Sequence, residues 1–509
     1  MTEITRREFG RLLGAAAVSG TLPSLTPGPA PSEGFAPSAL QGAELVYMPA
    51  TELAARLKRK DVSAREVLSA HVAHIERVNP KVNAIVTTAF DRAMADAARA
   101  DESIARGTSL GPLHGLPIAH KDLVETEGIR TTRGSPFYRD LVPAQDAPIV
   151  RRMRAAGAIT LGKTNTPEFG AGSHTFNTIF GATRNPYDTS KSCGGSSGGA
   201  AVALATGMIP IADGSDTGGS LRNPAAFCNV VGFRPSPGRV PTGGSSWSPL
   251  SVSGPMARNV ADAALLLSVQ ASGNDTSSPL AIMEDGARFG APLNRDFRGV
   301  RVAWWRGLGG IPFERDIVNT VNATRYIFEG LGCVVEEAEP SFDGIDEAFA
   351  TLRHLSYHTS YAALARQRPE WIKDTIHWEI REAERQTAAD VARASARQAR
   401  AYADAQQFFS RYEYFILPVT QVMPFDVTIA YPTSIAGTSM ATYIDWMRSC
   451  WYITFLANPA ISVPAGFAPS GLPVGLQIVG RHRADWSVLQ LAHAFEQATG
   501  HGKRRPSTG

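Results

Sequence analysis

Short apolar runs alternate with longer amphipathic segments through most of the chain. The stretch SAREVLSAHVAHIERV, residues 63–78, opens with Ser63 and Glu66 in a capping-box spacing and then repeats apolar residues at helical spacing. It predicts an amphipathic helix. Compact apolar runs at residues 116–119 and 158–161 predict short buried strands. We expect regular structure to begin near residue 51.

The alternation continues to the end of the chain. Residues 300–340 predict a strand, a helix and a second strand, with Gly332 ending the helix. YFILPVT, AISVPAGF and GLQIVG predict late strands, and DWSVLQLAHAFEQATG predicts a closing helix that stops at Gly500. Strands and helices that alternate end to end predict a single large α/β domain, with helices covering both faces of a sheet.

Residues 348–400 are predominantly helical, polar and aromatic. Most of this region is expected to form solvated helices packed outside the sheet. Four aromatic residues are candidates for the mouth of a pocket: Tyr357, Tyr361, Trp371 and Trp378.

Composition narrows the function classes. The 509 residues are 43% apolar, and 50 basic against 47 acidic residues leave a net charge of +3. This balance argues against a nucleic-acid or membrane surface. Four cysteines without CxxC spacing argue against a disulfide scaffold or a zinc site, and are expected to be small buried side chains: Cys193, Cys228, Cys333 and Cys450.

The N-terminus carries a targeting signal pattern. Arg6 and Arg7 precede a short Ala/Gly-rich apolar run that is too short to cross a membrane, which needs about 20 residues. The pattern is typical of a bacterial twin-arginine signal, with a disordered basic start as the alternative. We expect residues 1–42 to be signal peptide and linker, residues 43–509 to form the catalytic domain, and the location to be periplasmic or secreted.

Two glycine–serine clusters surround an Ala-rich helical segment between residues 191 and 228. The first, GSSGG, satisfies G-x-S-x-G with Ser197 in the nucleophile position. That motif requires a preceding strand, and RNPYDTSKSC is rich in turn residues instead, so a Ser-His-Asp hydrolase is disfavoured.

The second cluster, DGSDTGGS, packs small residues before Ser220. Glycines there leave consecutive N–H groups free to converge on one point, as in a backbone oxyanion hole, although either cluster alone could be a tight turn. Lys121 ends the predicted strand GLPIAHKDL.

Taken together, these segments resemble the amidase signature family of serine hydrolases. The resemblance runs from about residue 51 to about residue 499. It is carried by GLPIAHKDL, GKTNTPEFG, FGATRNPYD, CGGSSGGAAVALATG, DGSDTGGSLRNPAAFCNVVGFRPS, GPMARNVADAALLL and ANPAISVPAGFAPSGLPVGLQIVGR. It implies the amidase signature fold, a mixed central β-sheet between helices. One departure is SHTFN, residues 173–177, which lacks the acidic residue that many relatives have before the asparagine and leaves substrate preference more open.

The resemblance also implies a Ser-Ser-Lys triad. Ser220 is expected to be the nucleophile, Lys121 the base, and Ser196, after a cis peptide bond, the bridge between them. The backbone N–H groups of Thr217, Gly218, Gly219 and Ser220 correspond to the oxyanion hole, while Asp216 and Arg222 match positions that hold the loop.

This triad makes physical sense without the family. A serine hydroxyl needs a base to take its proton. Lysine can act only when neutral, and its ordinary pKa of about 10.4 must therefore fall through burial.

The predicted reaction is hydrolysis of a carboxylic amide to the acid and ammonia or an amine, through an acyl-serine. Alternatives are a carbamate, ester or urea-type hydrolase with the same triad, or the ammonia-producing subunit of a tRNA-dependent amidotransferase, which an export signal disfavours. No cofactor and no metal is expected. The expected partner is a small-molecule amide, with no nucleic acid, no membrane after export, and a monomer or homodimer. Three aromatic residues weakly indicate an apolar or aryl substrate: Trp446, Trp451 and Tyr452. Three histidines are expected to be structural: His120, His174 and His354.

Overall fold

The computed structural model describes residues 42–241, 247–271, 276 and 278–508. The predicted signal peptide and most of the linker therefore lie outside the described residues. Within the described part, no helix is both long and apolar enough to cross a membrane.

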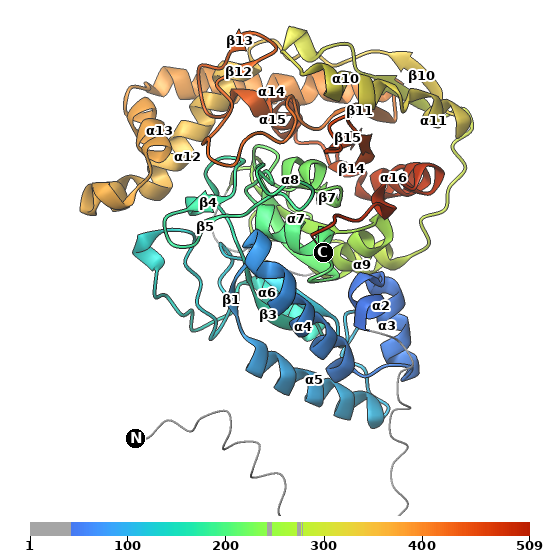
Figure 1. The fold of residues 1–509 in the computed structure, drawn as a ribbon. Helices are drawn as coiled ribbons and strands as arrows, with labels where there is room; N and C mark the ends of the chain where they lie inside the picture. Colours follow the sequence, from blue (N-terminus) through green and yellow to red (C-terminus); the bar gives the residue numbers. More distant parts are fainter. Residues whose placement is uncertain (1–41, 242–246, 272–275, 277, 509) are drawn as a thin grey trace, which may run out of the picture. The chain divides into compact units, whose positions relative to one another are not determined.

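One mixed sheet organises the α/β domain (Figure 1). Its eleven strands lie in the order β1-β3-β2-β6-β8-β7-β14-β15-β11-β9-β10. Their bounds are β1 Ile85–Thr88, β2 Pro117–Lys121, β3 Ile159–Thr164, β6 Ile211–Asp216, β7 Val231–Arg234, β8 Val252–Ala257, β9 Arg301–Trp304, β10 Val334–Glu337, β11 Tyr414–Pro418, β14 Ala460–Phe467 and β15 Pro473–Gly480. Two short hairpins, β4 Phe176–Asn177 with β5 Gly181–Ala182 and β12 Ser434–Ile435 with β13 Thr438–Ser439, stand apart from it.

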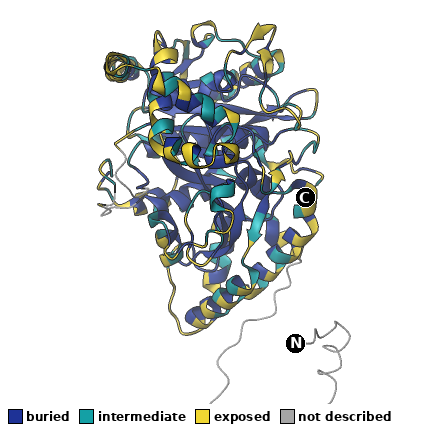
Figure 2. Ribbon diagram, turned by 90° about the vertical axis from the view of Figure 1, so that its left-hand side faces the viewer, coloured by how far each residue is buried: buried dark blue, intermediate teal, exposed yellow. Residues whose placement is uncertain are grey.

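The direction of the strands changes across the sheet. β2 runs parallel to both β3 and β6, whereas β6, β8, β7, β14 and β15 pair antiparallel in succession. Because parallel strands end at the same edge, the last residues of β2 and β6 come close together. Figure 2 shows the sheet as the buried centre, with exposed residues on the surrounding helices.

Helices flank the sheet and confirm the predicted fold class. They are α2 Gly42–Tyr47, α3 Ala50–Arg59, α4 Ala64–Val82, α5 Phe90–Ala105, α6 Pro148–Ala155, α7 Gly198–Ala205, α8 Arg222–Phe227, α9 Val260–Gln270, α10 Arg315–Asn322, α11 Arg325–Gly330, α12 Ile345–Gln367, α13 Asp374–Glu384, α14 Ala388–Arg411, α15 Arg448–Phe455 and α16 Asp485–Thr499. Short 3₁₀ turns are η1 Pro136–Tyr138, η2 Glu168–Gly170, η3 Gly286–Gly290, η4 Leu308–Gly310, η5 Pro369–Trp371, η6 Asp445–Met447 and η7 His501–Lys503.

Local signals in the sequence fix several helix ends. The predicted capping box is present at the start of α4, where Ser63 and Glu66 exchange hydrogen bonds. α16 ends at Gly500, which adopts the left-handed conformation with φ 63°. At the start of α4, side chains pair with backbone N–H groups that have no partner within the helix. At the end of α16, a glycine adopts the left-handed conformation that lets the last backbone groups pair.

Two sequence-based expectations were wrong in detail. Regular structure begins before residue 51, because α2 starts at Gly42 and α3 at Ala50. The single helix predicted between β9 and β10 is divided into α10 and α11. The break lies at Thr324, whose hydroxyl donates to the Val321 carbonyl at 2.7 Å and so competes with helical backbone pairing.

The polar-aromatic region forms α12, α13 and α14, and α12 packs against each of the other two (Figure 1). As predicted, these helices lie outside the sheet, and many of their residues are exposed. α12 also borders the functional cavity described next.

Candidate active site

A cavity of about 320 Å³ opens beside the ends of β2 and β6. Its wall combines small polar residues with aromatic and apolar ones. The lining residues are Leu123, Phe169, Gly170, Gly172, Ser173, Ser196, Ser215, Thr217, Gly218, Ser220, Ser248, Leu250, Ser251, Arg353, Ser356, Tyr357, Ser360, Tyr361 and Met447. The structure therefore places two of the predicted catalytic serines, Ser196 and Ser220, on one cavity.

Lys121, the last residue of β2, lies directly behind this wall. Its Nζ atom is 2.7 Å from Ser196 Oγ, and 3.0 Å from both Ser197 Oγ and Ser215 Oγ. The side chain is fully buried. Burial lowers the pKa of Lys121 to about 7, although the negative charges of Asp213 and Asp216 oppose the shift. A substantial fraction of this amine is therefore neutral near pH 7, as a general base requires.

The loop before α7 presents Ser196 to the lysine. The Gly195–Ser196 peptide bond is cis, as the family resemblance implied. Ser173 Oγ donates to the Gly195 carbonyl at 2.7 Å, and Thr175 Oγ1 donates to the Gly194 carbonyl at 2.9 Å. The SHTFN segment, where the sequence departs from many relatives, thus holds this loop in place.

Close backbone packing explains a glycine at the start of α7. A Cβ atom at Gly199 would lie 2.3 Å from the backbone nitrogen of Asn165. Only glycine allows α7 to approach the end of β3 this closely. Ser197, immediately before α7, hydrogen-bonds to Lys121 and to no histidine among the described residues, so the structure does not support Ser197 as a nucleophile of the G-x-S-x-G type.

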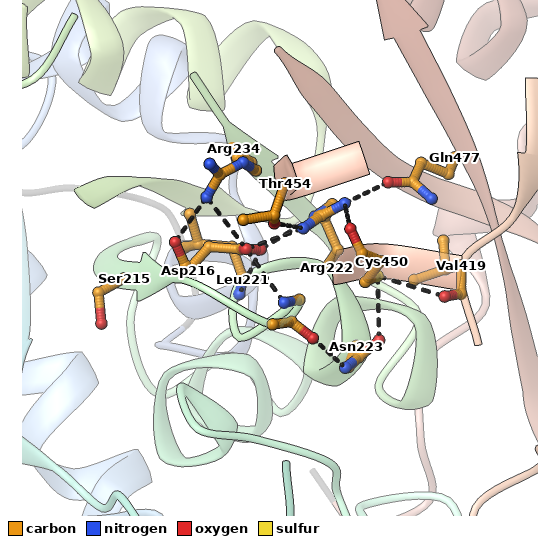
Figure 3. A network of polar contacts seen from close by, with 12 residues as sticks. Ser215, Asp216, Leu221, Arg222, Asn223, Arg234, Val419, Cys450, Thr454 and Gln477 are labelled. Carbon is orange, nitrogen blue, oxygen red and sulfur yellow. Dashed lines mark hydrogen bonds and ion pairs between the residues drawn. The ribbon is translucent and has the colours of Figure 1, made fainter. Parts of the chain in front are cut away.

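The loop after β6 is held by a buried ion pair (Figure 3). The Asp216 carboxylate accepts hydrogen bonds from the Gly219 and Leu221 N–H groups at 3.0 and 3.2 Å. Arg222 donates to the same carboxylate through two nitrogens, at 2.8 and 2.9 Å. These contacts give Asp216 and Arg222 the supporting role that the sequence predicted.

The ion pair connects the loop to distant parts of the chain. Arg222 also donates to the Cys450 carbonyl, to Thr454 Oγ1 and to Gln477 Oε1, so that the loop is joined to α15 and β15 (Figure 3). Burial alone would raise the pKa of Asp216, but the Arg222 and Arg234 guanidiniums hold it well below its usual range. The carboxylate therefore stays ionised at any pH near neutrality.

The predicted oxyanion donors separate into two groups. Thr217, Gly218 and Ser220 line the cavity, and their N–H groups have no hydrogen-bond acceptor in the described part of the chain. Gly219 differs, because its N–H donates to Asp216 and it does not line the cavity. In this structure the Gly219 amide holds the loop, whereas the other three N–H groups face the cavity without an acceptor among the described residues.

Sequence reasoning missed Ser197 and Ser215 as partners of Lys121. Ser215 meets Lys121 because β2 and β6 pair in parallel, and Ser197 meets it because of where the loop before α7 lies, so no local pattern indicates either contact with the lysine. It also missed Arg353 in the cavity wall, although its spacing to Tyr357 and Tyr361 on α12 places all three on one helix face.

Aromatic residues line the cavity in part as predicted. Tyr357 and Tyr361 border it, and Phe169 stacks on Tyr361 with ring centroids 4.5 Å apart. Trp371 and Trp378 do not border it. The aromatic residues expected to hint at the substrate are instead buried in the hydrophobic core and do not line this cavity: Trp446, Trp451 and Tyr452.

The three histidines singled out from the sequence have structural partners. His120 Nδ1 lies 2.7 Å from Asp213, His174 Nδ1 lies 2.7 Å from Ser192 Oγ, and His354 Nδ1 lies 2.5 Å from Glu379. The four cysteines are buried and unpaired, as predicted. Among the described residues, no group of three or more His, Cys, Asp or Glu side chains is arranged to hold a metal ion.

Comparison with known proteins identifies the family of the chain. The family model described as Amidase matches residues 66–489. An acylamidase from Rhodococcus erythropolis is 36% identical, covering 91% of this chain and 98% of its own. A glutamyl-tRNA(Gln) amidotransferase subunit from Moorella thermoacetica is also 36% identical, covering 92% of this chain and 99% of its own.

Solved structures share the fold. The crystal structure of a bacterial aryl acylamidase of the amidase signature family superposes with a TM-score of 0.82 at 30% identity, covering 89% of this chain and 96% of that one. Family model, relatives and structure coincide over most of the chain. The protein therefore belongs to the amidase signature family, whose members are hydrolases of carbon–nitrogen amide bonds.

Proposed function

We propose that the protein hydrolyses carboxylic amides through an acyl-serine intermediate, with Ser220 as nucleophile, Ser196 as proton relay and Lys121 as base. The observation that carries this proposal is the contact of Lys121 with Ser196. The buried amine has a pKa of about 7 and lies 2.7 Å from the hydroxyl, so a neutral amine can accept its proton.

In the acylation step, Ser220 Oγ attacks the amide carbon. The Ser220 proton passes to Ser196 Oγ as the Ser196 proton passes to Lys121 Nζ. The tetrahedral intermediate then collapses, the C–N bond breaks, and a proton returns from Lys121 through Ser196 to the leaving nitrogen. Water next attacks the ester by the same relay, releasing the carboxylic acid and restoring Ser220.

Backbone donors are expected to stabilise the intermediate. The N–H groups of Thr217, Gly218 and Ser220 border the cavity and lack acceptors within the described chain. A negative oxygen that forms on the former carbonyl would be held by this set, and each such donor is worth about 3–4 kcal/mol of barrier.

The cavity wall favours a carboxylic amide with an aromatic or apolar substituent. Phe169, Tyr357 and Tyr361 supply aromatic surface, and Leu123, Leu250 and Met447 supply apolar surface. Flat rings pack well in such surroundings. Similarity to an acylamidase and an aryl acylamidase supports the same substrate class.

A turnover screen tests this assignment. Acylanilides, aliphatic amides, peptide C-terminal amides and aryl carbamates would be offered to the wild-type protein, with Ser220→Ala as blank. We expect acylanilides to be cleaved fastest. Carbamate turnover well above amide turnover would favour the carbamate alternative, and turnover that persists in Ser220→Ala would contradict the nucleophile assignment.

A second candidate is ammonia production from glutamine for a tRNA-dependent amidotransferase. It is favoured by the 36% identity to the amidotransferase subunit, which equals that to the acylamidase. Including glutamine in the same screen distinguishes the two. Faster release of ammonia from glutamine than of aniline from acylanilides would support the amidotransferase role.

A further inference from the structure

A second cavity of about 550 Å³ lies where the end of the chain passes α2, α7 and α9. None of its lining residues borders the catalytic cavity. Ala205, the last residue of α7, lines it, whereas Ser197 precedes the first residue of the same helix. Ser197 and Ala205 therefore lie at opposite ends of α7, a helix about 12 Å long.

Positive charge dominates this second cavity. Four cationic side chains line it, and the one acidic side chain among its lining residues is Glu496: the cations are Arg258, Lys503, Arg504 and Arg505. None of the four forms an ion pair with a carboxylate in the described part of the chain. Unpaired cations around a concave surface are an arrangement that attracts anions.

Arg258 lies deepest in this group and is held by uncharged acceptors. Its guanidinium donates to the Ile209 carbonyl at 2.8 Å and the Met48 carbonyl at 2.8 Å. Burial lowers the pKa of Arg258, and the charge of Asp262 opposes this shift; the Asp262 carboxylate already accepts from the Ala50 and Thr51 N–H groups at 2.7 and 2.9 Å. The site therefore orients the guanidinium without neutralising it.

An aromatic ring adjoins the cations. The Arg505 guanidinium carbon lies 4.1 Å from the Tyr47 ring centroid, and the Arg258 guanidinium carbon lies 5.9 Å from it. A ring face stabilises a cation but leaves its N–H groups able to donate.

The carboxyl of Glu496 does not cancel this charge. It accepts the Val260 N–H at 3.0 Å and is buried, and burial raises its pKa to about 8. Most of this group is protonated at pH 7, where it contributes a hydrogen-bond donor rather than a negative charge.

We propose that this cavity binds a small organic anion with a carboxylate or phosphate group, its oxygens held by Arg258 and Arg505. The oxygens of a carboxylate or a phosphate match the fork of a guanidinium, and hydrogen bonds to the main chain hold Arg258 in place before the ligand arrives. This site is independent of the proposed amide hydrolysis.

Calorimetric titration tests the site, with benzoate and phenyl phosphate as probes at low ionic strength. The Ser220→Ala protein would be used, so that catalysis plays no part. We expect one molecule of at least one probe to bind per chain, and the preferred probe identifies the carboxylate or the phosphate. Arg505→Gln is expected to weaken binding about tenfold, the loss for one charge-assisted hydrogen bond.

Matched variants make the result decisive. Arg505 is exposed, so its replacement is expected to preserve the fold, whereas Arg258→Gln also removes hydrogen bonds to the main chain. Arg411→Gln, an exposed arginine at the end of α14, is the control and is expected to leave binding unchanged. Failure of both probes to bind, or equal binding to the Arg505→Gln protein, would overturn the proposal.

Discussion

Gly219 lies against Cys450 so closely that no side chain fits between them. A Cβ atom on Gly219 would be 2.6 Å from Cys450 Cβ, and Gly219 has a φ of 103° that residues with side chains rarely adopt. Gly218, one residue earlier, is different: its nearest neighbour would be Met447 Cε at 3.9 Å. Adjacent glycines therefore have unequal tolerance for a methyl group.

This difference predicts the outcome of two alanine variants. We expect Gly219→Ala to displace the loop that carries Ser220 and the predicted oxyanion donors, and to lower kcat about 100-fold or more. Gly218→Ala keeps its N–H and is expected to retain the fold and most of kcat. Steady-state kinetics with thermal unfolding would measure both, and similar losses in the two variants would contradict this account.

The Lys121 base predicts the pH dependence of the reaction. Because burial brings the pKa of Lys121 to about 7 and the neutral amine is the active form, kcat/KM is expected to rise through about pH 7 and then level off. Rates measured with an uncharged acylanilide from pH 5 to 10 would show this. A profile that is flat through pH 6 to 8 would remove Lys121 from the role of base.

The same pKa shift affects stability. The unfolded chain holds the Lys121 proton up to about pH 10.4, while the folded chain releases it near 7, so the free energy of unfolding is expected to rise between these values. Lys121→Met cannot titrate. Urea unfolding at pH 7 and pH 9 is expected to show a smaller increase in this variant than in the wild type, and equal increases would argue against a depressed pKa.

The Asp216–Arg222 pair predicts a large stability loss when one partner is removed. Asp216→Asn leaves Arg222 buried without its counter-charge, at a cost of about 3–5 kcal/mol. The folded pKa of Asp216 is depressed, so its stabilisation is present above its unfolded pKa of about 3.9 and is lost as the pH falls below it. Unfolding at pH 7 and pH 3 would measure both effects; an Asp216→Asn protein as stable as wild type at pH 7 would contradict them.

Covalent labelling distinguishes Ser220 from the neighbouring serines. A fluorophosphonate is expected to modify Ser220 alone, and peptide mapping by mass spectrometry would locate the adduct. Ser220→Ala is expected to lose labelling and about 10⁴-fold or more of kcat, whereas Ser109→Ala, at an exposed position, serves as control. An adduct on Ser197 would instead support the G-x-S-x-G reading.

The twin-arginine pattern predicts export of the folded protein to the periplasm. Replacing both Arg6 and Arg7 with lysine is expected to retain the protein in the cytoplasm, with Arg11→Lys as control. Fractionation of expressing cells measures the location. Undiminished periplasmic accumulation of the double variant would contradict the export signal.

The sequence was most informative at helix ends, where a residue interacts only with its neighbours in the chain. Ser63 with Glu66 predicted the start of α4, and Gly500 predicted the end of α16. It was less informative where the outcome depends on contacts between distant segments. Nothing near Ser215 in the chain indicates that its hydroxyl meets Lys121, because that contact exists only once β2 and β6 pair.

The same limit applies to the cavity wall. Trp446 and Trp451 were plausible substrate contacts by residue type, yet their large apolar area is buried in the core. Gly219 matched a donor position in the family pattern, but a hydrogen bond to Asp216 occupies its amide. Such cases depend on where a side chain points and on which acceptor a backbone N–H meets. Both are set by the three-dimensional fold and cannot be read from the sequence.

The contacts of Arg222 have a mechanical consequence for the enzyme. One buried guanidinium fastens the loop of Ser220 to α15 and to β15 in the middle of the sheet. We therefore expect this loop not to unfold locally before the rest of the protein. On heating, catalytic activity and tertiary structure are expected to be lost in the same transition.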